Sequence, residues 1–148
     1  MNNYLKPADI GDCDILFEWA NDPETRRQSF NSNPIAYEDH VSWFNSKLQS
    51  PDSRIFILYS DDTPCGTIRL DRINDSSSFL ISYNIAPQAR GRGLGKEILR
   101  LAFKEVNTPS ALVAFVKPEN IASRHCFEFL GFSRSEESEN EIKYEMTI

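Results

Sequence analysis

The feature that most constrains the fold is a strand that runs into a glycine-rich turn and then a helix, in ISYNIAPQARGRGLGKEILRLAF at residues 81–103. The apolar run stops at Pro87, and a helical pattern begins a few residues later. Between them, three glycines stand at alternate positions: Gly91, Gly93 and Gly95. Glycine can adopt a positive φ and lets another molecule approach the main chain. The junction therefore predicts either a tight strand-to-helix turn or a turn that receives a ligand.

This turn has the chemistry of an anion site. A helix begins with unpaired N–H groups and a partial positive charge, so a turn without side chains can hold a phosphate on its amides. Arg90 and Arg92 can add charge-assisted hydrogen bonds. The alternative is that both arginines are simply solvated. The turn is not a Walker loop, because GxxxxGK[ST] is absent, and GxGxxG does not match residues 91–96.

The rest of the chain alternates between helical and strand periodicity. Apolar spacing predicts the helices, while β-branched and aromatic runs between turn residues predict strands, three of them in an antiparallel meander. The expected order is a strand at 2–7, helices at 12–20 and 36–50, strands at 54–60, 65–73 and 78–86, a helix at 93–106, a strand at 111–117, a helix at 120–131, and one or two strands within 132–148. Residues 24–34 read as a polar connection. One mixed sheet with helices on both faces, an α/β (α+β) fold, is the natural packing.

Length and composition limit the class of protein. The 148 residues fit a single domain over 1–148 that can bury a full core. A net charge of −6 argues against binding to duplex nucleic acid, which needs a basic face. Three scattered cysteines, Cys13, Cys65 and Cys126, predict neither a disulfide framework nor a metal site. Without a signal pattern or an apolar run of about 18 residues, the chain is expected in the cytoplasm and not in a membrane.

Two sequence blocks together resemble a known superfamily. QARGRG, at residues 88–93, matches the pattern Q/R-x-x-G-x-G/A, and NIASRHCFEFLGF, at residues 120–132, is an Asn-led helix that ends in Gly-Phe. Both blocks and the order of elements resemble the GNAT acetyltransferase superfamily. The resemblance implies a GNAT fold, with one splayed, mostly antiparallel sheet of about six to seven strands and about four helices on its two faces. Its fourth and fifth strands are expected to part and admit acetyl-CoA.

The same resemblance implies how acetyl-CoA (coenzyme A) is bound. The pyrophosphate is expected on the amides of residues 89–94, and the pantetheine arm is expected along the strand edge near residues 84–86. The implied cofactor-binding residues are Asn84, Ile85, Ala86, Gln88, Arg90, Gly91, Arg92, Gly93, Leu94, Gly95, Asn120 and Phe127.

The N-terminal third carries the resemblance that concerns the acceptor. WANDPETRRQSFNSNPIAYEDHVSWFNSKL resembles bacterial GNAT enzymes of the pseudaminic acid pathway type, which acetylate nucleotide-linked amino sugars. It is similar, more loosely, to ribosomal-protein N-terminal acetyltransferases, whose acceptor is a protein α-amine. The implied acceptor-binding residues are Trp19, Asn21, Arg26, Phe30, His40, Trp43, Ser82 and Tyr83. Helical spacing favours core packing for both tryptophans, and the alternatives for Arg26 and His40 are a solvated arginine and a capped or surface histidine. The oligomeric state stays open, a homodimer included.

The proton-handling groups depart from the superfamily pattern. Phe127 stands where the leaving-group acid is usually a tyrosine, and Leu80 stands where a carboxylate is usual. A sugar amine with a pKa of about 8 is already partly neutral near pH 7 to 8, so a modest base can suffice. The candidate catalytic residues are His40, Asp71 and Ser123, although Ser123 also reads as a first-turn helix serine bonded to the backbone. The competing interpretation of the whole chain is a non-catalytic acetyl-CoA sensor.

Overall fold

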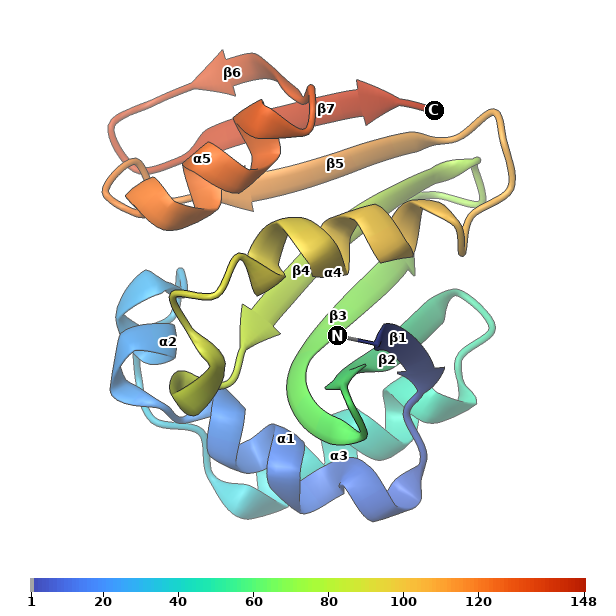
Figure 1. Cartoon of the computed structure of the whole chain (residues 1–148), viewed down its shortest axis with the longest axis vertical. Coiled ribbons are helices and arrows are strands. Elements are labelled where there is room, and N and C mark those ends of the chain that lie inside the picture. Colours follow the sequence, from blue (N-terminus) through green and yellow to red (C-terminus); the bar gives the residue numbers. More distant parts are fainter. Residues whose placement is uncertain (1) are drawn as a thin grey trace.

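Strands and helices follow the predicted order in the computed structural model, which describes residues 2–148 (Figure 1). The strands are β1 (Asn3–Pro7), β2 (Ser53–Ser60), β3 (Thr63–Arg72), β4 (Ser78–Ile85), β5 (Ala111–Val116), β6 (Ser133–Glu137) and β7 (Ile142–Thr147). The helices are α1 (Cys13–Ala20), α2 (Pro23–Gln28), α3 (Tyr37–Gln49), α4 (Leu94–Phe103) and α5 (Ile121–Phe129), with 3₁₀ turns at Ile10–Asp12 and Pro87–Ala89. Across residues 2–148 the strands form one sheet in the order β1-β2-β3-β4-β5-β7-β6. The predicted mixed α+β class is confirmed.

The sheet forks between β4 and β5. β2, β3 and β4 form an antiparallel meander, as the turn residues between them predict, and β1 pairs antiparallel with β2. β4 pairs with β5 in parallel over residues 78–80 and 111–113, and the two strands then diverge, which Figure 1 shows along their length. β5 continues the sheet through an antiparallel pairing with β7. The predicted splay is confirmed, and residues 81–85 of β4 present a strand edge to the fork.

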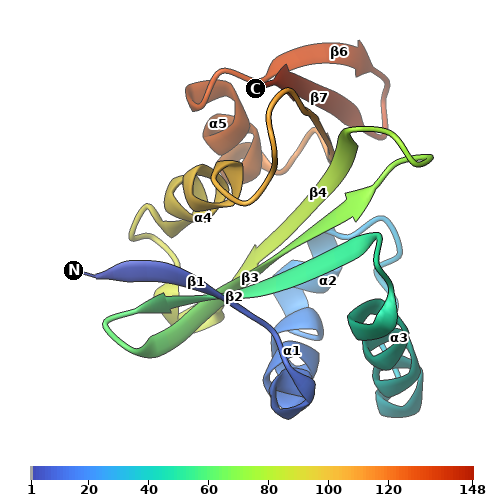
Figure 2. The same ribbon diagram turned by 90° about the vertical axis from the view of Figure 1, so that its right-hand side faces the viewer.

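Helices cover both faces of the sheet (Figure 2). α1 and α3 lie on one face, while α4 and α5 lie on the other. Residues 55–58 of β2 are accordingly buried in succession, because neither face of this inner strand meets solvent there. α4 buries one apolar stripe against the sheet: Leu94, Ile98, Leu99 and Ala102. No helix within residues 2–148 combines the length and apolarity needed to cross a membrane.

The α2 helix corrects one expectation. The sequence reads as a polar connection at residues 24–34, whereas Pro23–Gln28 form a helix, which brings the described part of the chain to five α-helices rather than about four. Asp22 caps this helix, since its Oδ2 accepts a hydrogen bond from the Thr25 N–H at 3.1 Å. Pro23 suits the first helical position because its φ is fixed and it has no N–H to satisfy. The same Asn-Asp-Pro motif therefore ends α1 and begins α2.

The boundaries of α5 follow the prediction closely. Asn120 is the N-cap, with its Oδ1 accepting from the Ser123 N–H at 3.2 Å. Gly131 follows the helix with a φ of +98°, a conformation that favours glycine. The helix start is thus fixed at the edge of the fork, where its first turn faces β4.

Candidate active site

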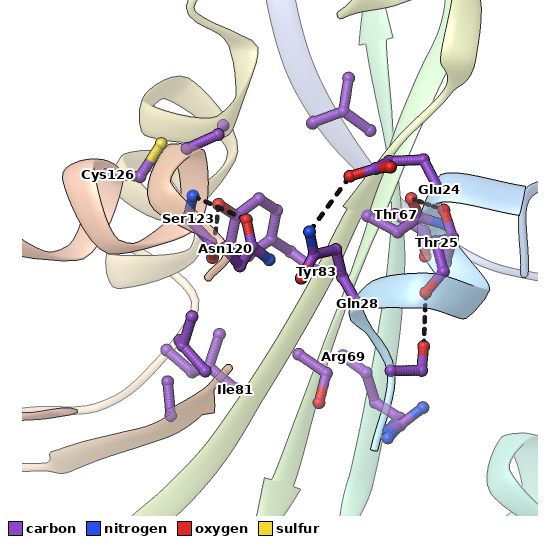
Figure 3. Close-up of a pocket in the computed structure, with 18 of the residues that line it drawn as sticks. Glu24, Thr25, Gln28, Thr67, Arg69, Ile81, Tyr83, Asn120, Ser123 and Cys126 are labelled. Atoms are coloured by element: carbon purple, nitrogen blue, oxygen red, sulfur yellow. Dashed lines mark hydrogen bonds between the residues drawn. The ribbon is translucent and has the colours of Figure 1, made fainter. Parts of the chain in front are cut away.

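A cavity of about 810 Å³ opens where β4 and β5 diverge. Residues 81–85 of β4 and 114–116 of β5 line it, together with parts of α2, α3, α5 and the start of α4. Figure 3 shows α2 residues such as Thr25 on one side of this cavity and α5 residues such as Ser123 on the other. One cavity therefore connects the predicted cofactor turn with the predicted acceptor residues.

The glycine turn has the conformation that its sequence favours. Gly91 and Gly93 have φ values of +78° and +75°, in the left-handed region. Gly93 is the N-cap of α4, and a Cβ built at either glycine would meet no heavy atom within 4 Å. The turn amides therefore border open space at a helix N-terminus, which is the arrangement that an anion needs.

Arg90 links this turn to the start of α2. It donates from Nη2 to Asp22 Oδ2 at 2.7 Å and to Thr25 Oγ1 at 3.1 Å. Burial raises the pKa of Asp22, but the hydrogen bonds from Arg90 and Thr25 outweigh this and hold that pKa below its usual value. Thr25 also donates to Asn84 Oδ1 at 3.1 Å, and Asn84 donates to the Trp19 carbonyl at 3.1 Å. Side chains of the turn, α2 and β4 thus form one polar network.

At the α5 wall, a tyrosine from β4 meets a serine. The Tyr83 hydroxyl lies 3.1 Å from Ser123 Oγ, within hydrogen-bond distance. Burial, and next the neighbouring Cys126 thiol, raise the pKa of Tyr83 well above its usual range, so this phenol stays neutral. Phe127 is 2% exposed, and its ring packs against Tyr83 at a centroid distance of 5.8 Å. Phe127 is therefore both a cavity wall and a core residue.

Aromatic and cationic groups also line the cavity. The Arg69 guanidinium lies over the Trp43 ring, 5.0 Å from its centroid, and Asp71 holds it through an ion pair of 2.7 Å. Trp43 is 38% exposed and Phe30 is 54% exposed, although both line the cavity. Phe115 from β5 adds a third partly exposed aromatic ring. The cavity lining thus includes aromatic faces and a guanidinium that Asp71 and Trp43 hold in place.

His40 lies beneath these aromatics. It is buried, and its Nε2 is 2.9 Å from the Cys13 carbonyl oxygen. A carbonyl oxygen only accepts, so Nε2 carries a proton and Nδ1 is the nitrogen left with a basic lone pair. The ring packs against Phe17, Trp43 and Phe44, with centroid distances of 5.3, 5.9 and 6.1 Å.

Two predicted acceptor residues hold the loop between α2 and α3. Arg26 donates from Nε to the Ala20 carbonyl at 2.6 Å and from Nη1 to the Asn31 carbonyl at 3.0 Å. The Asn21 amide makes paired hydrogen bonds with the backbone N–H and C=O of Ile35, at 2.8 and 3.0 Å. These contacts fix the loop that carries Phe30 at the cavity mouth.

Asp71 lies outside the cavity lining and accepts hydrogen bonds from several donors. It accepts from Ser53, Arg69 and Lys47. Burial raises the pKa of Asp71, but these hydrogen bonds and the adjacent positive charge outweigh it and hold the pKa below its usual value. A carboxylate in this state is a weak base.

Most of the predicted site residues line the one cavity. They are Arg26, Phe30, His40, Trp43, Ser82, Tyr83, Asn84, Ile85, Arg90, Gly91, Gly93, Leu94, Gly95, Asn120, Ser123 and Phe127. The predicted residues outside this lining are Trp19, Asn21, Asp71, Ala86, Gln88 and Arg92. Trp19 is 4% exposed and belongs to the hydrophobic core.

The sequence reasoning missed several lining residues. They are Glu24, Thr25, Gln28, Thr67, Arg69, Lys96, Phe115, His125 and Cys126. For β3 a signal existed, because Thr67 pairs with Asn84 and Arg69 pairs with Ser82 across the meander. Assigning the register of that hairpin would have placed both beside predicted residues.

Comparison with known families identifies the family of the chain. Residues 4–133 match the model of the acetyltransferase (GNAT) domain. The chain belongs to this family, and it is an acetyltransferase domain, as its two sequence blocks predict. No curated protein matches the chain significantly. The assignment to the narrower pseudaminic acid pathway type is carried by the sequence resemblance alone.

Solved structures share the fold at low sequence identity. A domain from Methanocaldococcus jannaschii DSM 2661 has a TM-score of 0.85 and 21% identity, covering 99% of both chains. Spermidine N-acetyltransferase from Vibrio cholerae, in complex with CoA and spermine, has a TM-score of 0.82 and 18% identity, covering 99% of this chain and 94% of its own. AAC(6')-Ib in complex with ribostamycin and coenzyme A gives the same values. These likenesses establish the GNAT fold for the chain.

Proposed function

We propose that the chain transfers the acetyl group of acetyl-CoA to the primary amine of a nucleotide-linked amino sugar. Structures of the same fold contain CoA or acetyl-CoA, as in the V. cholerae enzyme and in yncA from Salmonella typhimurium. The open glycine turn offers amides for the pyrophosphate, and the β4 edge at residues 81–85 offers backbone groups for the pantetheine arm. The domain over 1–148 is proposed to act in the cytoplasm, without nucleic acid or membrane, and a homodimer is left to experiment.

The observation that carries the choice of acceptor is the pairing of Arg69 with Trp43 in a cavity that Phe30 also lines. Exposed aromatic faces suit a nucleobase or a sugar ring, and a guanidinium suits the phosphates of a nucleotide. Glu24 is the one carboxylate among the described residues that line the cavity, and it is ion-paired with Arg27 at 2.7 Å. A polycationic acceptor such as spermine, which the V. cholerae structure contains, calls for more negative charge than this.

The chemistry needs little acid–base help. The amine attacks the thioester carbonyl, and backbone amides at the β4 edge can stabilise the oxyanion. Positioning of the two substrates in one cavity supplies a large part of the rate. Of the bases suggested by the sequence, His40 is preferred over Asp71, because His40 lines the cavity, whereas Asp71 lies outside the lining and already accepts from three donors. Asp71 is assigned to holding Arg69 over Trp43.

A turnover assay tests this function. Purified protein and acetyl-CoA are mixed with a nucleotide-linked amino sugar, the same sugar without its nucleotide, spermidine, or a peptide with a free α-amine, and thiol release is measured. We expect the highest kcat/KM with the nucleotide-linked sugar and a loss of that preference in Trp43→Ala. If only the peptide or only spermidine supports turnover, that compound represents the acceptor class and the nucleotide-linked sugar does not. Tight acetyl-CoA binding without turnover on any amine would mean a sensor.

A further inference from the structure

The leaving-group end of the cavity lacks the expected acid but contains another hydroxyl. Phe127 stands where the superfamily resemblance implies a tyrosine, and its ring has no proton to donate. Ser123 lies one helical turn earlier on the same side of α5 and lines the same cavity. Its Oγ is hydrogen-bonded to Tyr83 from the opposing strand, rather than serving only the helix backbone. The serine therefore has a partner that can direct its proton.

The Tyr83 phenol is held in place on several sides. Its ring meets Phe127 edge to face, with an interplanar angle of 66°. A Cβ on Gly95 would lie 3.4 Å from the Tyr83 hydroxyl and 2.9 Å from Cys126 Sγ, so the first turn of α4 closes over the phenol without space to spare. In Figure 3, Tyr83 lies beside Ser123 and Asn120, at the α5 side of the pocket. A hydroxyl fixed in this way can orient its neighbour.

We propose that Tyr83 is a positioning residue for departure of the thiolate: its O–H donates to Ser123 Oγ and turns the Ser123 hydrogen toward the sulfur. When the tetrahedral intermediate collapses, the C–S bond breaks and its electron pair goes to sulfur. The developing thiolate accepts a hydrogen bond from Ser123. The amine loses one proton when it attacks, and the thiolate takes up one proton to leave as the free thiol, so the charges balance. Neither Ser123 nor Tyr83 loses a proton in this cycle.

The direction of the Tyr83–Ser123 hydrogen bond follows from relative acceptor strength. In the resting protein either hydroxyl can donate to the other. A sulfur that gains negative charge is a stronger acceptor than a neutral phenol oxygen, so the Ser123 hydrogen moves to it and Tyr83 becomes the donor. Burial keeps the phenol protonated, and its hydrogen is therefore available throughout turnover. The phenol near the leaving group thus comes from Tyr83 on β4, whereas the superfamily pattern has a tyrosine on α5 at the position of Phe127.

The proposal rests on the acetyl transfer of the proposed function but not on the identity of the acceptor. Steady-state kinetics are measured with whichever amine in the panel gives turnover. If no amine does, hydrolysis of acetyl-CoA, in which water replaces the amine, reports the same departure of the thiolate. A different acceptor would thus change the proposed function and leave this test intact.

The decisive comparison uses Tyr83→Phe, Ser123→Ala and the double variant. Removing one oriented hydrogen bond at a developing charge is expected to lower kcat about tenfold or more in each single variant, with the KM for acetyl-CoA within about twofold of wild type. The double variant should be no slower than Ser123→Ala, because Tyr83 acts through the serine. Unchanged kcat in Tyr83→Phe, or losses that multiply in the double variant, would overturn the proposal.

Tyr144→Phe is the matched control. The Tyr144 ring also stacks on Phe127, at 5.6 Å, and its hydroxyl donates to Glu128 Oε2 outside the cavity lining. This substitution removes a hydroxyl group from a ring in the same cluster, so a general packing effect would appear in both Tyr83→Phe and Tyr144→Phe. We expect wild-type kcat in Tyr144→Phe, and an equal loss in both would assign the Tyr83 effect to packing. Melting temperatures of all variants verify that they fold.

Discussion

Replacing Gly91 by valine should separate cofactor binding from folding. Gly91 has a φ of +78°, and a Cβ there would meet no heavy atom within 4 Å, so the cost to the fold is conformational rather than steric. That cost is about 1–2 kcal/mol for a residue with a side chain, and a β-branched residue lies at the upper end. In the proposed binding mode, the pyrophosphate approaches the turn amides through this open space. Losing two hydrogen bonds to a charged group, at about 1.5–3 kcal/mol each, predicts at least a hundredfold weaker binding.

Gly131→Val is the control for this substitution. Gly131 has a φ of +98° after α5, and its Cβ would lie 3.7 Å from Met146 Sδ, an ordinary contact outside the cavity lining. Both variants should lose several degrees of melting temperature, since about 1 kcal/mol shifts a domain of this size by roughly 3–4 °C. In titration calorimetry only Gly91→Val should lose affinity for acetyl-CoA. Wild-type affinity in Gly91→Val, or equal losses in both variants, would refute the assignment of the turn.

Three further predictions concern stability and coupling. Asp71→Asn should lower the free energy of unfolding at neutral pH by about 1–2 kcal/mol. The folded-state pKa of Asp71 is lowered, so its contribution to stability is present above the unfolded pKa of about 3.9 and is lost as pH falls through the folded pKa. The urea midpoints of the variant and the wild type should therefore converge in acid. Gly95→Ala should cost about 1–3 kcal/mol through its 2.9 Å contact with Cys126 Sγ, and Cys126→Ala in the same chain should restore part of the loss of urea midpoint. Asp22→Asn should tighten acetyl-CoA binding roughly two- to fivefold at low salt by releasing Arg90, whereas unchanged calorimetric affinity would mean that Arg90 stays bound to α2.

The sequence predicts the fold wherever the signal is local. The change from helical to strand periodicity, and the turn residues between strands, place every strand of the meander. Glycine at positions 91 and 93 predicts a left-handed turn because side chains disfavour that conformation, and both φ values are positive. The Asn120 cap is predictable because its hydrogen-bond partner, Ser123, is only three residues away. Local rules therefore locate the glycine turn and the start of α5.

The missed parts depend on residues that are distant in the chain. The Tyr83–Ser123 contact joins residues 40 apart, and the Arg90–Asp22 pair joins residues 68 apart. Neither follows from periodicity, because each needs the relative placement of two packed elements. The Arg69–Trp43 pair likewise combines a strand and a helix on one face of the sheet. α2 was missed because Asn-Asp-Pro reads as the end of one helix, although the same residues begin the next.

A structure of the protein with acetyl-CoA tests the central claim most directly, that the fork between β4 and β5 is the acetyl-donor site. The account predicts pyrophosphate oxygens on the amides of residues 89–94, pantetheine along residues 84–86 of the chain, and the thioester sulfur within hydrogen-bond distance of Ser123 Oγ. The acetyl group should point toward Trp43. A cofactor bound outside the fork, or a sulfur that lies far from Ser123, would contradict the account.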